Sequence, residues 1–149
     1  MDSKNFKTII DFLMKNNGFT AAYGGWYKES QDAIIVLCLQ HSTYGPTYYL
    51  NIKIYIHGFL NQVYKISKFL VQSDVGDIFT RPLKEYSNIF DLDNSLTDDT
   101  RKVLLESMFS NYLVPLSNLS LSKQGILELE NRNWIILLPA VNNYLRTNK

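Results

Sequence analysis

Side chains that could act as acids, bases, nucleophiles or metal ligands are few in this sequence, and they stand far apart. The histidines His41 and His57 fall toward opposite ends of one predicted strand, and Thr47 to His57 alone would span roughly 30 Å. No cysteine or carboxylate stands at ligand spacing from either histidine. Cys38, the single cysteine, lies in the apolar run 33–39, which predicts a buried, unreactive thiol.

The acidic stretch 91–99 (DLDNSLTDD) resembles the start of a calcium-binding loop. Its sixth position is Leu96 where that loop needs glycine, and its twelfth is Lys102 where the loop needs a bidentate glutamate. Asp98 and Asp99 are explained by the positive end of a helix. We therefore expect no metal and no cofactor.

Catalytic motifs are not evident. The sequence has no Gly-x-Ser-x-Gly elbow, no Cys/His pair and no His-Glu-x-x-His run. No residue is assigned a catalytic role, and an enzyme assembled from distant residues stays open as an alternative.

The most informative surface belongs to the stretch 47–57, which alternates between two kinds of side chain and is therefore predicted to be a β-strand. An apolar side carries Tyr48, Leu50, Ile52, Ile54 and Ile56, and a polar, tyrosine-rich side carries Tyr49, Asn51, Lys53, Tyr55 and His57. Tyrosine provides large contact area with a polar tip, which suits protein interfaces and small concave sites. Trp26 and Gln40 could neighbour this side, depending on strand register. Alternatively, C-terminal helices cover it.

The elements that would position this surface can be read along the chain. A helix is predicted over 3–16, with Ser3 as the residue that can cap its N-terminus and Gly18 as the residue that can end it. Strands follow at 19–22, 26–28, 33–40 and 47–57, and a short edge strand at 77–81 is stopped by Pro82. The pair 33–40 and 47–57 forms an antiparallel hairpin, whereas 58–76 fits a strand or a helix equally.

Helices are predicted for the C-terminal third. Thr97 begins the clearest one, Ser122 caps a shorter one, and Pro139 starts a last turn. The fold class is therefore α+β, with an N-terminal helix, an antiparallel sheet, and C-terminal helices packed mainly on one side of the sheet.

Composition narrows the functional classes. The 149 residues are 46% hydrophobic and 19% charged with a formal net charge of +1, which is typical of one domain spanning 1–149. Lysine and arginine do not cluster, so a nucleic-acid partner is not expected. The longest apolar runs, 33–39 and 134–141, are far shorter than the roughly 20 residues of a membrane span. With no secretion signal at the start, we expect a soluble cytoplasmic protein without membrane contact.

Several short motifs, in order and spacing, resemble the bacterial family known as domain of unknown function 4304. They are Gly18-Phe19, Trp26-Tyr27, Leu39-Gln40-x-Ser42, Tyr49-x-Asn51-Ile52, Arg81-Pro82 and Phe90-Asp91. The chain departs from the family pattern at 20–22, where Thr-Ala-Ala replaces a basic stretch, and at Lys53, where glycine is usual. The resemblance implies a fold but no activity, and it directs attention to Gln40, Asn51 and Arg81.

Two functional hypotheses follow. The first is a non-catalytic protein-binding module, similar to an immunity protein that blocks a toxin. The second is a small ligand-binding domain or enzyme with a pocket built from Gln40, Asn51, Tyr55 and Arg81. The candidate binding residues for either are Trp26, Gln40, Tyr49, Asn51, Lys53, Tyr55 and Arg81. Partner identity and oligomeric state are left open.

Overall fold

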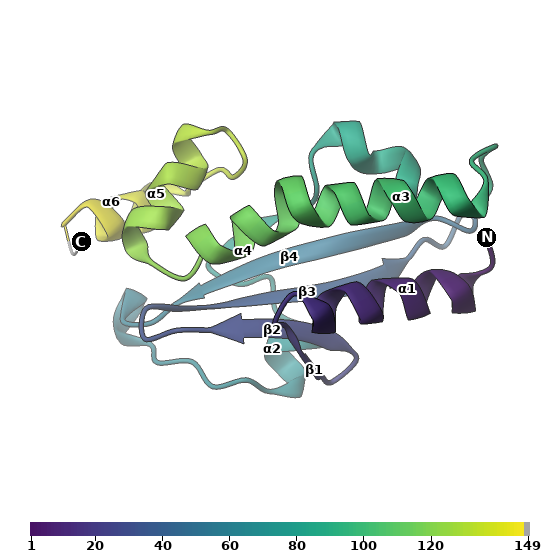
Figure 1. Ribbon diagram of the computed structural model, residues 1–149. Coiled ribbons are helices and arrows are strands. Elements are labelled where there is room, and N and C mark those ends of the chain that lie inside the picture. The colour runs from purple at the N-terminus through teal and green to yellow at the C-terminus, as the bar shows by residue number, and fades with distance from the viewer. Residues whose placement is uncertain (148–149) are drawn as a thin grey trace.

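The sheet is a meander in which five antiparallel strands lie in the order in which they occur along the chain (Figure 1). The computed structural model describes residues 1–147. The strands are β1 (Thr20–Ala22), β2 (Gly25–Glu29), β3 (Ala33–His41), β4 (Tyr48–Ile56) and β5 (Ile78–Thr80). This arrangement confirms the predicted antiparallel sheet and α+β class.

Helices precede, interrupt and follow the strands. The helical elements are α1 (Ser3–Asn16), η1 (Phe59–Asn61), α2 (Lys68–Gln72), η2 (Lys84–Phe90), α3 (Asp98–Met108), η3 (Phe109–Leu113), α4 (Val114–Leu119), α5 (Lys123–Asn131) and α6 (Pro139–Thr147). Of those helices, none combines the length and apolar content needed to cross a membrane.

Strands β3 and β4 form the predicted antiparallel hairpin, and they are the two longest strands of the sheet. Its register runs from Ala33 opposite Ile56 to His41 opposite Tyr48. Because side chains alternate along each strand, the even-numbered residues of β4 share one face with Ile35 and Leu37 of β3. We call this the helix face.

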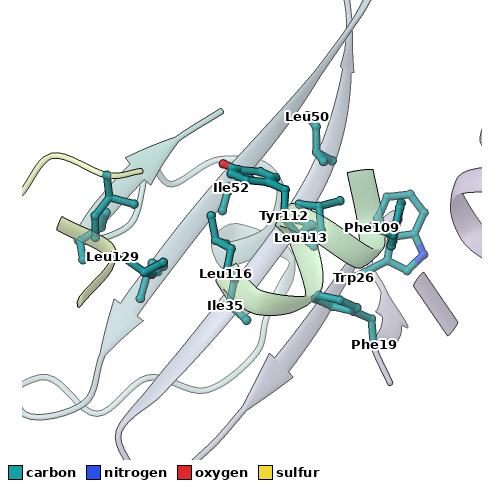
Figure 2. Packing of buried hydrophobic residues seen from close by; sticks show 14 of the residues in the cluster. Phe19, Trp26, Ile35, Leu50, Ile52, Phe109, Tyr112, Leu113, Leu116 and Leu129 are labelled. Atoms are coloured by element: carbon teal, nitrogen blue, oxygen red, sulfur yellow. The ribbon is translucent and has the colours of Figure 1, made fainter. Parts of the chain in front are cut away.

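The helix face is covered by α1 and by a long helical rod made of α3, η3 and α4 (Figure 1). The element η3 is a π-helical turn that joins α3 to α4 without a break. Figure 2 shows Tyr112, Leu113 and Leu116 of the rod gathered over Ile35 and Ile52 of the sheet, and all five are fully buried. Helices α5 and α6 extend the same apolar core.

The opposite side of the sheet, which we call the second face, carries the odd-numbered residues of β4. A smaller apolar cluster lies there, in which Ile34, Val36 and Tyr55 of the sheet meet Leu70 and Val71 of α2. The prediction that C-terminal helices cover this face is wrong, because the segment 58–76 and its helix α2 do so instead.

The ends of the helices are mostly where the sequence predicts them. Thr97 and Ser122 cap α3 and α5 through their side-chain oxygens, and Pro139 is the first residue of α6. At α1 the capping side chain is Asp2, which accepts a hydrogen bond from the Asn5 amide, rather than the predicted Ser3.

Candidate functional site

Half of the second face is closed to solvent. Lys53 is 4% exposed, and its ammonium group donates hydrogen bonds to the carbonyl oxygens of Leu70 (3.3 Å) and Val71 (2.8 Å). The hydroxyl of Tyr55, which is fully buried, donates to the same Leu70 carbonyl at 2.7 Å. These carbonyls belong to the last turn of α2, where no backbone N–H of the helix is available to donate to them. Lys53 and Tyr55 therefore hold α2 against the sheet.

Burial also changes the acid–base properties of this half. It lowers the pKa of the Lys53 amine and raises the pKa of the Tyr55 hydroxyl. Lys53 and Tyr55 share one face of β4 with Tyr49 and Asn51, as the alternation predicts, but α2 covers them and neither group is open to a ligand.

The other half of the second face carries a cluster of polar side chains from three strands or strand ends. The Asn51 amide donates to Gln40 Oε1 at 2.9 Å, and Arg81 Nε donates to Asn51 Oδ1 at 3.0 Å. Arg81 Nη2 lies 3.5 Å from Gln40 Oε1. The three residues singled out by the resemblance are thus joined in one hydrogen-bonded triangle.

Two aromatic rings complete this cluster. The guanidinium carbon of Arg81 lies 4.4 Å from the ring centre of Tyr49 and 5.7 Å from that of Phe79. These distances are within the range of cation–π contacts. We call Gln40, Tyr49, Asn51, Phe79 and Arg81 the arginine cluster.

Two depressions flank the arginine cluster. A polar hollow of about 350 Å³ includes Tyr23, Cys38, Gln40, Asn51 and Gln72 in its lining. An apolar cleft of about 210 Å³ lies beside β4, where β5 has ended, and its walls include Tyr49, Leu50, Arg81, Pro82 and Phe90. The cluster therefore forms a ridge between a polar and an apolar recess.

Cys38 is half-buried in the wall of the polar hollow, on the side of the sheet that carries Asn51. Burial raises the pKa of its thiol. The neutral thiol therefore predominates at pH 7, and an activated nucleophile is not indicated.

Trp26 is not part of this surface. It pairs with Leu37, which places it on the helix face, where it is 7% exposed. Its indole N–H donates to Asp11 Oδ1 at 2.8 Å, and this bond together with the one from Lys15 lowers the pKa of Asp11. The register between β2 and β3 therefore places Trp26 away from the tyrosine-rich side of β4, whereas Gln40 lies on that side.

The histidines and the acidic stretch have structural partners. His57 Nδ1 accepts a hydrogen bond from the Tyr64 amide, and the His41 ring packs edge-on against Tyr48. In the acidic stretch, Asn94 Oδ1 accepts from the buried Arg101 at 2.7 Å. Across residues 1–147, no group of three or more histidine, cysteine or acidic side chains is placed to hold a metal.

Three residues of this surface were not predicted from the sequence: Phe79 in the arginine cluster, and Tyr23 and Gln72 in the lining of the polar hollow. Phe79 lies opposite Lys53 in the sheet, and this pairing puts its 42% exposed ring on the second face. A signal existed, because Phe79 is the central residue of the predicted edge strand. Tyr23 and Gln72 are joined by a 2.8 Å hydrogen bond from the Gln72 side chain to the Tyr23 carbonyl, a contact between distant segments that no local pattern encodes.

Comparison with known proteins gives one match. Residues 10–118 match the family described as Domain of unknown function (DUF4304). The arginine cluster lies wholly inside the matched region. No curated protein and no solved structure matches the chain.

Proposed function

The chain belongs to the DUF4304 family, a domain of unknown function, and from this premise we propose that it is a non-catalytic protein-binding module. Its binding surface is the arginine cluster with the two recesses beside it. The observation that carries the proposal is the triangle of Gln40, Asn51 and Arg81, which fixes an exposed arginine between two exposed aromatic rings.

The composition of the cluster supports binding to a protein. Arginine and tyrosine are enriched among the residues that dominate binding energy in protein interfaces. Here Tyr49 is 37% exposed and Phe79 is 42% exposed, although both could have been buried by a longer covering segment.

Further apolar side chains are exposed beside the cluster and on the covering segment. Tyr23, on the turn before β2, is 51% exposed and lines the polar hollow together with Gln40 and Asn51. On the covering segment, Phe69 of α2 is 61% exposed and Val75 before β5 is 62% exposed. An exposed apolar ring beside a fixed arginine supports an interaction site.

Within this proposal the protein is a bacterial, cytoplasmic module of the immunity type, which binds a toxin and blocks it. Its small size and near-neutral charge of +1 support that assignment. The buried titratable groups Lys53 and Tyr55 also support a non-catalytic role, because their hydrogen bonds hold α2 in place.

Affinity capture tests the proposal. The full chain is used as bait in extract from the native host, beside a Tyr49→Ala/Phe79→Ala double variant and the control Val103→Ala, which removes a 63% exposed side chain from α3. We expect a partner that wild type and Val103→Ala retain and that the double variant loses, with binding then confirmed between the purified proteins.

The same comparison between the wild-type bait and the double variant can contradict the proposal. If every retained protein binds the double variant as well as the wild type, the arginine cluster is not a protein-binding surface. Urea unfolding of each bait ensures that a lost partner does not reflect an unfolded variant.

A small ligand-binding domain, or an enzyme with a pocket on the sheet face, is the second candidate. The observation in its favour is the polar hollow, whose volume of about 350 Å³ falls in the range of small-molecule sites. Three of the four residues expected to build such a pocket, Gln40, Asn51 and Arg81, come together, but Tyr55 is buried beneath α2. Saturable binding of a metabolite that Asn51→Ala abolishes would favour this candidate over the first.

A further inference from the structure

We propose that the arginine cluster recognises an acidic side chain of the partner, with the carboxylate on the Arg81 guanidinium and a neighbouring apolar side chain in the apolar cleft. This inference rests on the proposed function, because it specifies the chemistry of the partner segment.

The first argument is the charge of Arg81. Arg81 takes part in none of the ion pairs found among the residues that the structure describes. Its two side-chain hydrogen bonds go to the neutral amide oxygens of Asn51 and Gln40. A guanidinium has five N–H donors, so the bonds to Asn51 and Gln40 leave donors for a ligand. The side chain is exposed, and arginine matches a carboxylate through two parallel hydrogen bonds.

The second argument is that Arg81 is already held in place. Its Nε is fixed by Asn51 at 3.0 Å, and its plane lies over the Tyr49 ring at 4.4 Å. Asn51 is itself fixed by its bond to Gln40. A side chain restrained in this way loses less conformational freedom when it binds, which favours affinity.

The third argument is the apolar cleft next to the guanidinium. Arg81 and Tyr49 belong to its wall, and Leu50, Pro82 and Phe90 make the rest of it largely apolar. Its volume of about 210 Å³ has room for one apolar side chain. A ligand that satisfies both features places an apolar group directly beside a carboxylate.

The position of the ridge assigns that carboxylate to a side chain rather than to a chain terminus. Gln40 and Asn51, which bond to Arg81, also line the polar hollow, whereas Arg81 lines the apolar cleft. A partner segment that lies across the arginine cluster can fill both the polar hollow and the apolar cleft. Its main chain then faces the side-chain amides of Gln40 and Asn51. A glutamate inside the segment lets its main chain continue on both sides of Arg81, whereas a terminal carboxylate ends the chain there and can reach over one side only.

Peptide titrations followed by nuclear magnetic resonance test this inference on the full ¹⁵N-labelled chain. The probe is an acetylated and amidated peptide, Gly-Gly-Glu-Leu-Gly-Gly, and its matched control carries glutamine in place of glutamate. A third peptide, Gly-Gly-Gln-Leu with a free carboxyl terminus, represents the terminal source of a carboxylate. Each is titrated to roughly 10 mM, which saturates even a millimolar site.

We expect the glutamate peptide to shift the Arg81 Nε–H and Asn51 side-chain signals and to bind at least about tenfold more tightly than the glutamine peptide, as a charged bidentate pair implies. Arg81→Gln should abolish this preference. Arg132→Gln should preserve it, because Arg132 is also an arginine beside an aromatic ring, 5.2 Å from the centre of Trp134, but it caps the C-terminal end of α5, outside the cluster.

Four results would overturn the inference: equal affinity for the glutamate and glutamine peptides, a preference that survives Arg81→Gln, stronger binding of the free-terminus peptide, or no shift with any peptide. None of them removes the protein-binding proposal, which depends on capture by Tyr49 and Phe79. Conversely, if every protein retained by the wild-type bait also binds the Tyr49→Ala/Phe79→Ala variant, that proposal fails even if the glutamate peptide binds.

Discussion

At the scale of single residues, two buried tyrosines differ in whether their hydroxyl groups are hydrogen-bonded. Tyr55 and Tyr112 are both fully buried, yet the Tyr55 hydroxyl donates to Leu70, whereas the Tyr112 hydroxyl has no hydrogen-bond partner among the described residues. A satisfied buried hydroxyl stabilises a fold by about 0.5–1.5 kcal/mol, and an unsatisfied one costs about 1–3 kcal/mol.

The two corresponding phenylalanine variants should therefore shift stability in opposite directions. We expect Tyr55→Phe to lower the free energy of unfolding by about 1 kcal/mol and Tyr112→Phe to leave it unchanged or raise it. Urea unfolding measures both, with Tyr44→Phe as the control because the Tyr44 side chain is 97% exposed. A loss of stability in Tyr112→Phe as large as that in Tyr55→Phe would contradict the interpretation.

The candidate residues show what a sequence can establish about a site. Alternation along β4 places Tyr49, Asn51, Lys53 and Tyr55 on one face correctly. It cannot show that Lys53 and Tyr55 are covered, because the covering helix comes from a distant segment. The side of the sheet that carries Trp26 was left open for a different reason: it depends on the register between β2 and β3, which is set across the turn at residues 30–32.

At the scale of elements, Gly125 lets the start of α5 lie directly against the end of α4. A Cβ added there would lie 2.0 Å from the carbonyl oxygen of Leu119, at the junction of α4 and α5. Backbone at that distance cannot move aside without shifting a helix, so α5 can pack as it does only with glycine at this position.

Gly125→Ala should destabilise the protein by at least about 1–3 kcal/mol, the cost of overpacking. Helix propensity predicts the opposite sign, because alanine is favoured over glycine within a helix by up to about 1 kcal/mol. The control is Gly45→Ala, where an added Cβ meets nothing within 4 Å, and a change within about 0.5 kcal/mol is expected. Thermal unfolding that ranks the two variants equally would refute the packing argument.

Most elements were predictable because their signals are local. The helix over 3–16, the hairpin of β3 and β4 and the caps at Thr97 and Ser122 follow from periodicity and capping chemistry. The segment 58–76 was not, because it contains a three-residue turn, a loop and the five-residue α2. So short a helix is not stable by itself and forms through contacts to the sheet.

At the scale of the whole molecule, the family match ends before the structure does. The matched region stops at residue 118, within α4, yet α5, α6 and the segment between them contribute buried side chains to the main core. These side chains are Ile126, Leu129, Ile135, Val141 and Leu145. Removing them would expose the apolar core of the sheet at one end.

A chain that ends at residue 118 should therefore lose its cooperative urea unfolding transition. The reason is that each fully buried aliphatic side chain contributes about 1.5–3 kcal/mol, and several are lost at once against a total stability of about 5–15 kcal/mol. Addition of a separate peptide spanning 119–149 should restore the transition. A truncated chain that unfolds in one steep transition would show instead that the matched region is independent.

The meander order of the strands has a consequence for how the chain emerges from the ribosome. Every strand pairs with its neighbour in sequence, so β1 to β5 can assemble once residues 20–80 have left the ribosome. At that moment Ile35, Ile52 and Ile54 have no cover except α1, because the helical rod follows the strands along the chain and has not yet emerged. The nascent sheet thus exposes an aggregation-prone aliphatic surface, and protection by chaperones is needed most during this interval.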